Sequence, residues 1–254
     1  MELFDTHCHL DVAAFDADRA QVLQHARELG VSNILVPGIE AGHWDGLLKL
    51  CETEAGLHPA LGLHPVFLER HRAEHLAQLE SSIKKHRPVA VGEIGLDFYQ
   101  HEADRDAQRT LFEAQLAIAR DARLPVVLHV RKAHDDVLSC LKKIPVTGGT
   151  VHAFNGSEQQ ARHYIEMGFM LGFGGTLTWE RSRKIRALAR RVPLEAVVLE
   201  TDAPDMVVAQ HAGERNSPEY LVYCLQALAE VRDSDPDTIA QQTTLNARTV
   251  FGLL

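Results

Sequence analysis

Cysteine, long apolar runs and a signal-peptide pattern are scarce or missing in this sequence. Its 254 residues include four cysteines, far apart and with no Cys-x-x-Cys pair, so we expect buried, reduced thiols. No run of 18 apolar residues occurs, so no membrane-spanning helix is predicted. Glu2 and Asp5 stand where a signal peptide would carry a basic and then an apolar region. We therefore expect a cytoplasmic protein with no membrane partner.

Positive charge is also in short supply. Lys and Arg number 26 against 35 Asp and Glu, which gives a formal net charge of −9. This balance argues against a protein that coats nucleic acid non-specifically. It leaves open a nuclease whose positive charge is local and is supplied partly by metal ions. The 15 histidines are a high number for this length and suggest a metal site.

Short apolar, β-branched runs alternate with amphipathic helical stretches along the chain. The predicted strands are residues 3–6, 33–37, 58–63, 90–94, 125–130, 150–153, 169–173 and 197–201. The predicted helices are residues 17–29, 42–54, 68–86, 104–122, 133–141, 157–166, 181–191, 217–231 and 237–251. Such alternation implies parallel βαβ units, and eight units predict an α/β fold of the (β/α)8 TIM-barrel type. With no repeat or Pro/Ser-rich linker, we expect one metal-dependent hydrolase domain over residues 1–254.

A glycine-rich phosphate loop is absent after the first predicted strand. The competing fold, a doubly wound open sheet, would usually carry that loop there. Residues 7–11 read His-Cys-His-Leu-Asp instead. The barrel is therefore the favoured fold.

Metal-capable side chains stand at the ends of several predicted strands. His7 and His9 are two residues apart at the end of the first strand, so they project from the same face. Later strand ends present His64, Glu93, His129, His152, and Glu200 with Asp202. Each alone could be a core or capping residue. A barrel brings all carboxyl ends to one face, however, and unpartnered burial would cost roughly a few kcal/mol for each, so a shared metal centre explains them together.

Six of these residues are predicted to be metal ligands: His7, His9, Glu93, His129, His152 and Asp202. Six ligands are too many for one tetrahedral ion and suit two. The first-strand histidines and Asp202 come from strands that are neighbours once the barrel closes, so we expect them to hold one ion. The histidines of the fifth and sixth strands should hold the other, with Glu93 reaching both. Imidazoles favour Zn, Mn, Ni or Fe over Mg.

Five strings of residues resemble a known family. They are His-Cys-His at 7–9, Gly-Glu-Ile-Gly-Leu-Asp at 92–97, Leu-His at 128–129, Val-His-Ala-Phe-Asn-Gly-Ser at 151–157 and Glu-Thr-Asp-Ala-Pro at 200–204. Together they resemble the signatures of the TatD-type metal-dependent deoxyribonucleases of the amidohydrolase-like barrel superfamily. The resemblance covers nearly the whole chain, from His7 to Asn246. It implies a divalent-metal phosphodiesterase that acts on DNA, often as an exonuclease, with single-stranded or frayed ends as the expected partner.

The sequence departs from the family in two places. Many relatives carry a proline- and Arg-Gly-containing segment after Asp-Ala-Pro, whereas residues 205–216 differ here, and Arg215 is our candidate for the missing cation. Asn155 stands where relatives often have a small hydroxyl residue. His64 and Arg131 are the other candidates for phosphate contacts. Arg131 is two residues after His129, so the two side chains share one face if the strand continues that far.

The predicted chemistry is phosphodiester hydrolysis by a two-metal-activated hydroxide. Two cations that share Glu93 would also share a water and lower its pKa toward neutrality. Asp202 is placed to ligate one ion and to act as general base. Glu93 and Asp202 are thus the catalytic candidates. Glu200, two residues before Asp202, is predicted to lie one layer deeper and to orient a ligand.

One basic run has no role in this scheme. It consists of Arg181, Arg183, Lys184, Arg186, Arg190 and Arg191. Ile185, Leu188 and Val192 mark the buried stripe of the same predicted helix, so the basic side chains spread over its exposed face. Two interpretations stay open, a solvated helix face and a track for the backbone of a DNA strand.

Two other functions compete with a deoxyribonuclease. One is a metal-dependent hydrolase of a small ester, amide or phosphoester; many such enzymes bridge their metals with a carboxylated lysine on the fourth strand, where this chain has Glu93. An apolar pocket would favour that function, and an open groove rimmed by cations would favour DNA. The other is a metal-binding quality-control protein without activity, which would be expected to have lost one of the six ligands.

Overall fold

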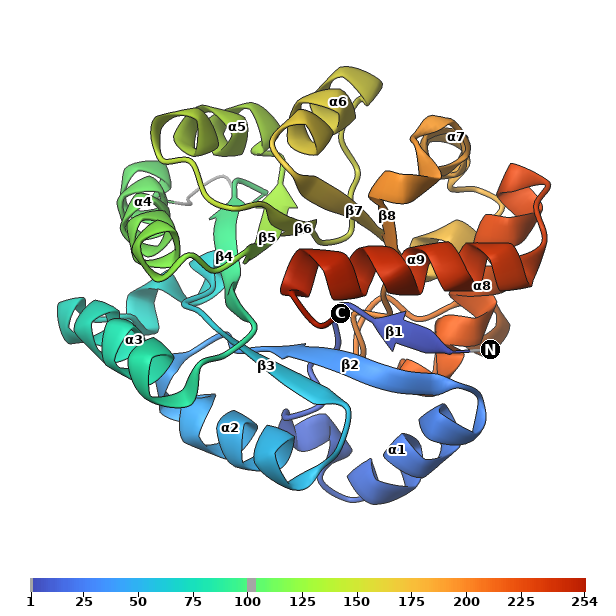
Figure 1. Ribbon diagram of the computed structural model, residues 1–254, viewed down its shortest axis with the longest axis horizontal. Coiled ribbons are helices and arrows are strands. Elements are labelled where there is room, and N and C mark those ends of the chain that lie inside the picture. Colours follow the sequence, from blue (N-terminus) through green and yellow to red (C-terminus); the bar gives the residue numbers. More distant parts are fainter. Residues whose placement is uncertain (1, 100–103) are drawn as a thin grey trace.

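Eight parallel strands form one sheet in sequential order in the computed structural model, which describes residues 2–99 and 104–254 (Figure 1). The strands are β1 Leu3–Asp5, β2 Val31–Pro37, β3 Leu57–Leu61, β4 Ala90–Asp97, β5 Val126–Arg131, β6 Gly149–Val151, β7 Phe169–Phe173 and β8 Val197–Leu199. Backbone bonds from Thr6 N to Leu199 O (3.0 Å) and from Asp202 N to His7 O (2.8 Å) join the last strand to the first. The predicted (β/α)8 barrel is therefore confirmed.

Helices surround the barrel as an outer ring (Figure 1). They are α1 Arg19–Glu28, α2 Trp44–Thr53, α3 Ala73–His86, α4 Arg105–Ala122, α5 His134–Lys143, α6 Glu158–Glu166, α7 Arg183–Arg191, α8 Leu221–Arg232 and α9 Pro236–Phe251. The longest, α4, begins where the side chain of Asp104 accepts a hydrogen bond from Ala107 N (2.9 Å), and it buries Phe112, Leu116 and Ala119 along one face. In the described part of the chain, no helix is long and apolar enough to cross a membrane.

The helix predicted to begin at residue 68 begins later, at Ala73. Residues Pro65–Arg70 form the short 3₁₀ segment η3 instead, and Phe67 inside it has non-helical backbone angles. The segment starts with the His64 side chain accepting a hydrogen bond from Val66 N (3.2 Å), followed by a proline whose fixed φ suits a helical first position. This turn places His64 and Phe67 above the barrel, so the corrected boundary bears on the site described below.

Helix α9 closes the end of the barrel at which the strands begin. Inside the barrel, Phe4 and other buried apolar side chains of the strands pack against Ala247 and Phe251 of α9. The Asn246 side chain donates hydrogen bonds to Leu194 O (2.8 Å) and Val197 O (2.7 Å), which ties α9 to the start of β8. Figure 1 shows α9 lying across the barrel in front. The carboxyl ends of the strands, which carry the candidate site, therefore lie on the opposite face.

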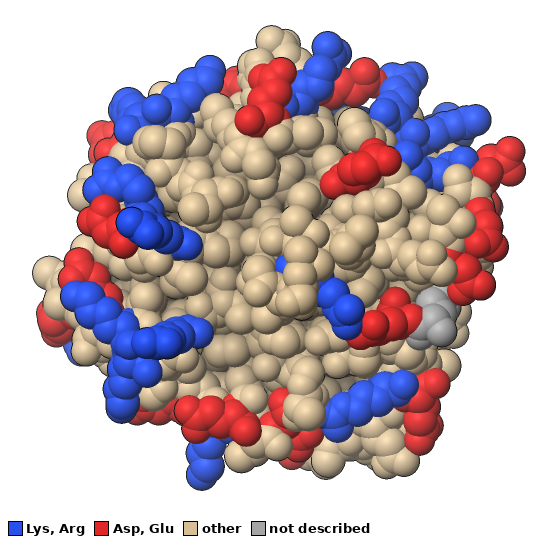
Figure 2. Space-filling model, viewed as in Figure 1, with Lys and Arg blue, Asp and Glu red and all other residues tan. Residues whose placement is uncertain are grey.

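The face covered by α9 carries no large area of one charge. Figure 2 shows Lys and Arg interspersed with Asp and Glu around its edge, and mainly uncharged side chains in its middle. A surface of mixed sign does not favour a polyanion.

Candidate metal centre

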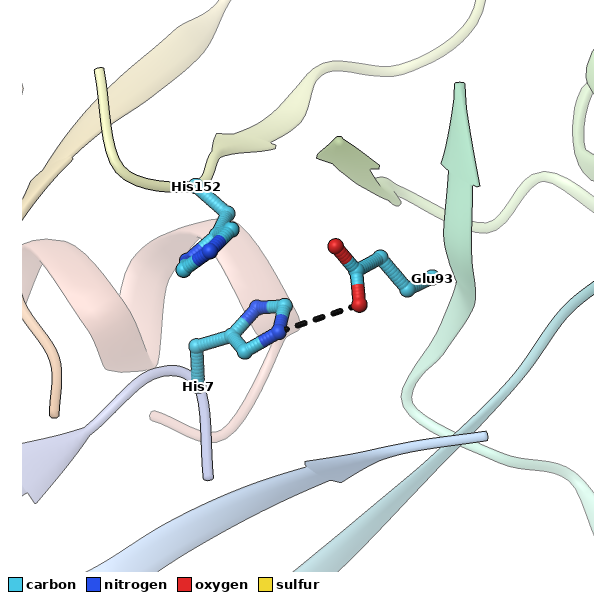
Figure 3. A group of neighbouring side chains, drawn as sticks. All are labelled: His7, Glu93 and His152. Atoms are coloured by element: carbon cyan, nitrogen blue, oxygen red, sulfur yellow. Dashed lines mark ion pairs between the residues drawn. The ribbon is translucent and has the colours of Figure 1, made fainter. Parts of the chain in front are cut away.

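The carboxyl ends of the strands converge on a buried cluster of imidazoles and carboxylates. His7 follows β1, Glu93 lies within β4, and His152 follows β6; Figure 3 shows these three side chains pointing toward one another. The side chains of His7 and Glu93 are 0% and 2% exposed. A charged carboxylate is rarely buried so deeply without a positively charged partner.

Two imidazole nitrogens and two carboxylate oxygens lie close together in one part of this cluster. His7 Nε2 lies 3.3 Å from His9 Nε2 and 3.2 Å from Glu93 Oε2, and His9 Nε2 lies 3.5 Å from the same carboxylate oxygen. Asp202 Oδ1 lies 3.8 Å from His7 Nε2 and 3.7 Å from His9 Nε2. Ligands about 2.0–2.2 Å from a tetrahedral ion would be about 3.3–3.6 Å apart. These distances are close to that range, and His7, His9 and Asp202 form one group able to hold a metal, with Glu93 Oε2 beside both histidines.

The second oxygen of Glu93 faces a different group. Oε1 lies 3.1 Å from His129 Nδ1 and 3.4 Å from His64 Nε2, and the three side chains form a second group able to hold a metal. The sequence predicts His152 as the partner of His129 and a phosphate contact at His64. In the structure, His152 Nε2 lies 3.4 Å from Asp202 Oδ2, and its ring stacks on that of His7 at 3.8 Å. All six predicted ligands thus lie in one cluster, joined by His64.

Two buried carboxylates fix the orientation of two of these histidines. Asp97 Oδ2 lies 3.0 Å from His129 Nε2, and Glu200 Oε1 lies 3.0 Å from His152 Nδ1. A carboxylate on one ring nitrogen leaves the other nitrogen free to act as a metal ligand. The sequence predicts such a role for Glu200 but not for Asp97. Asp97 is four residues after Glu93 on one strand, so both side chains lie on the same face. This spacing is the signal in the sequence that could have identified Asp97.

Asp5 is a second residue that the sequence analysis does not single out for the site. Its carboxylate accepts hydrogen bonds from Thr201 N (3.0 Å), Thr201 Oγ1 (2.5 Å) and His7 N (3.2 Å). Burial raises the pKa of Asp5 to about 7, against the effect of these hydrogen bonds. Asp5 joins the end of β1 to the end of β8, and so holds His7 and Asp202 in register with each other.

The shared carboxylates of the cluster, those of Glu93 and Asp202, stay ionised, which suits a cation. Burial alone would raise the pKa of Glu93, but the histidines around it, His64 and His7 first, hold that pKa well below its usual range. Burial likewise opposes the ionisation of Asp202, and His152 lowers the pKa of Asp202 to about 2. The pKa of His152 is raised well above its ordinary value, despite burial, by Glu200 and Asp202. A cation bound by His152 must therefore displace a proton.

Arg131 and Arg215 lie in different surroundings. Arg131 is exposed, packs over the ring of Tyr99 at 3.6 Å, and lines a groove next to the cluster. Arg215 donates to both carboxylate oxygens of Asp18 (2.9 and 2.7 Å) and to Ala14 O (2.6 Å). Arg215 therefore braces the start of α1, and the geometry does not support its predicted role as a phosphate contact.

The pocket above the cluster is small and partly apolar. Its volume is about 260 Å³. Besides His64 and the predicted ligands His9, Glu93, His129, His152 and Asp202, it is lined by Asp205 and by Val12, Ile39, Val66, Phe67 and Pro204. Among the described residues that line it, none is a lysine or an arginine. Positive charge in this pocket would therefore come chiefly from bound cations.

Replacing Gly172 with alanine is expected to lower the affinity for a divalent metal about 10–100-fold, the usual effect of losing a residue that orients a metal ligand. A Cβ at Gly172 would lie 2.2 Å from Glu200 Oε2, so the buried carboxylate must leave the position in which it lies 3.0 Å from His152. The matched control is Gly46→Ala within α2, where a Cβ meets nothing within 4 Å. Titration with Zn²⁺ or Mn²⁺, alongside melting temperatures, would test this. A folded Gly172→Ala variant with unchanged metal affinity would contradict the role of Glu200.

A TIM barrel with such a cluster at the carboxyl ends of its strands is the architecture of a metal-dependent hydrolase. Residues 4–252 match the model of the family described as TatD related DNase, and the chain belongs to that family. The resemblance seen in the sequence is thus confirmed over nearly the whole chain.

Two relatives and one solved structure show how close the similarity is. The uncharacterized metal-dependent hydrolase YjjV of Escherichia coli (strain K12) is 41% identical, with 98% of this chain and 97% of that protein covered. The crystal structure of YjjV matches with a TM-score of 0.96 at 39% identity, covering 99% of this chain and 98% of that one. The 3′-5′ ssDNA/RNA exonuclease TatD of Erwinia amylovora (strain ATCC 49946) is 34% identical, with 99% of this chain and 100% of that protein covered.

Proposed function

We propose that this chain hydrolyses phosphodiester bonds in DNA, working from a single-stranded or frayed end, with two divalent cations. One observation carries the proposal: the two oxygens of Glu93 face two separate groups of ligands, 3.2 Å from His7 on one side and 3.1 Å from His129 on the other. A carboxylate shared in this way is the usual bridge between two metal ions that act on a phosphodiester. The name of the Erwinia relative supports the choice of substrate.

Each residue of the cluster has a distinct part in the proposed reaction. Cations held here would lower the pKa of a water molecule and neutralise charge on the phosphate. Asp202 accepts the proton of the attacking water, because its side chain is 15% exposed to the pocket, whereas that of Glu93 is 2% exposed. His64 stands at the edge of η3, where it can contact a phosphate oxygen or complete the second group of ligands. Asp97 and Glu200 keep the rings of His129 and His152 in place.

The size of the pocket supports cleavage at an end of the strand. A volume of about 260 Å³ has room for one phosphodiester group but not for the nucleotides on both sides of it. Val66 and Phe67 on one wall and Pro204 on another restrict the path of a continuing strand. A terminal bond is therefore the expected site of cleavage. A cytoplasmic location stays our prediction, and the four free cysteines agree with a reducing compartment.

A second candidate is hydrolysis of a small ester or phosphoester. The observation in its favour is the same pocket, since its walls are partly apolar and none of its described lining residues is a lysine or arginine. A small uncharged substrate needs no further cations. A nucleic acid would need positive charge from another part of the same face.

Removing the metal is expected to abolish activity, and adding back Mn²⁺, Zn²⁺ or Mg²⁺ is expected to restore it, because the candidate ligands have no other means of activating water. The test compares an end-labelled single-stranded oligonucleotide, bis(4-nitrophenyl) phosphate and a 4-nitrophenyl carboxylate ester, each with a chelator control. A ladder of oligonucleotides shortened from one end would support the proposal. Rapid ester hydrolysis with an intact oligonucleotide would favour the second candidate, and full activity in chelator would contradict both.

A further inference from the structure

The structure divides the basic run of residues 181–191 into two unequal parts. Helix α7 follows β7, so its first turn lies toward the metal face and its last turn toward the face covered by α9. Arg186 pairs with Glu230 (3.1 Å) and donates to Leu177 O, and Arg191 pairs with Glu158. These two cations are neutralised by neighbouring helices. The remaining basic residues on the metal side need another explanation.

Three basic side chains at the metal end of α7 are exposed and have no acidic partner within 4 Å in the described chain: Arg181, Arg183 and Lys184. With Glu180, residues 179–184 carry a net charge of +2, in a chain whose net charge is −9. Lys184 Nζ donates to Asn155 O (3.0 Å), and Asn155 is three residues after His152. The basic group is therefore continuous with the rim of the metal centre.

An aromatic ring belongs to the same surface. Trp179 is partly exposed, and its indole nitrogen donates to Val207 O (3.1 Å), a bond that fixes the ring against the loop after β8. The guanidinium of Arg181 lies over this ring, 4.4 Å from its centre. Aromatic rings beside cations are the usual means by which proteins hold single strands, since every base can stack and every phosphate is anionic.

The residues in the first turn of α7 also make the start of this helix less stable than usual. Acidic residues and a side-chain cap normally stabilise the start of a helix, yet α7 has no acidic residue in its first turn, no side-chain hydrogen bond at its cap, and Arg183 and Lys184 as its first two residues. Like charges at the positive end of the helix dipole repel each other. An anion bound there would relieve that repulsion.

We propose that Trp179, Arg181, Arg183 and Lys184 form a strand-binding patch for single-stranded nucleic acid. Bases stack near Trp179, and the cations contact backbone phosphates of the strand whose end enters the metal centre. This inference rests on the proposed function, and it supplies the positive charge that the described lining of the pocket lacks. Continuity with Asn155 and the ring of Trp179 favour a nucleic acid over an acidic peptide.

The test is a pair of matched charge reversals on one helix. Arg183 and Arg190 are both exposed, but Arg183 lies at the metal end of α7 and Arg190 near the other. Arg183→Glu is expected to lower kcat/KM for an oligothymidylate of about 12 nucleotides roughly 5–10-fold, and to make the log–log salt dependence shallower by about 0.7 for each lost phosphate contact. Its kcat/KM for bis(4-nitrophenyl) phosphate should not change. Arg190→Glu should change neither rate.

Fluorescence anisotropy with the same oligonucleotide measures its Kd without requiring cleavage. Weaker binding by Arg183→Glu alone would support the patch. Equal effects of the two reversals, no effect of either, or no binding by the unmodified protein would overturn it. If the Arg183→Glu variant cleaves the oligonucleotide at the normal rate, the strand-binding patch is wrong and the proposed function stands. If the unmodified protein hydrolyses bis(4-nitrophenyl) phosphate but leaves the oligonucleotide intact, the proposed function itself is wrong.

Discussion

Replacing Glu93 with glutamine is expected to reduce kcat/KM for bis(4-nitrophenyl) phosphate by roughly 10³-fold or more, and to lower the number of metal ions bound per chain. Glutamine keeps the size of the side chain but removes its charge, and one of its two polar atoms can only donate hydrogen bonds. Glu93 lies within 3.5 Å of His7, His9, His64 and His129. The substitution therefore weakens both groups of ligands at once.

The measurements are steady-state kinetics and metal content by mass spectrometry. A suitable control is Glu166→Gln, which makes the same chemical change at an exposed position at the end of α6 and should leave both quantities unaltered. Circular dichroism would establish that both variants fold. If the Glu93→Gln variant bound two ions and kept full activity, the role of Glu93 as a bridge would be wrong.

The barrel could be predicted because its signals are local. A strand of this fold is a short apolar run, and a glycine or proline often separates it from the helix before it, so the order of elements follows from residues adjacent in the sequence. The same logic placed Glu93 and Asp202 at the carboxyl ends of their strands. Once the strands are parallel and adjacent, the barrel itself brings these ends together.

Features that depend on loops could not be predicted in this way. Arg215 is predicted to contact the substrate because its loop follows β8, but its partner Asp18 lies 197 residues earlier in the chain. Only the folded structure shows that the start of α1 lies within reach of this guanidinium. The ring of His64 lies 3.4 Å from Glu93, closer to the ligands than its position in the sequence indicates, because the turn of η3 brings it there. In both cases tertiary contacts determine the direction of a long side chain.

The conformation around Asp202 adds a further point that the sequence does not reveal. Asp202 has a left-handed backbone with φ of 60°, which an aspartate tolerates better than most residues. Its backbone nitrogen donates to His7 O (2.8 Å), and that bond joins β8 to β1 directly beneath the cluster. Such strain is found at functional sites when the surroundings hold it in place. The carboxylate is thereby fixed between the first pair of histidines and His152.

Replacing Asp202 with asparagine is expected to lower kcat about 10²–10⁴-fold, the range for loss of a general base, for the oligonucleotide and for bis(4-nitrophenyl) phosphate alike. Both substrates are attacked by water, so both depend on the group that takes its proton. The amide oxygen of asparagine can still serve as a ligand beside His7 and His9. Metal content should therefore fall less than it does in the Glu93→Gln variant.

A comparison of Asp202→Asn with Glu93→Gln distinguishes the loss of a general base from the loss of a carboxylate shared by two metal ions. Asp205 lines the same pocket three residues later, so Asp205→Asn is the matched control and should retain most of the activity. If the Asp202→Asn variant lost its metal as fully as the Glu93→Gln variant and recovered full activity when excess metal was added, Asp202 would be a ligand only. The proton of the attacking water would then have to leave through another group at the mouth of the pocket, and His64, 3.4 Å from Glu93, would be the first to test.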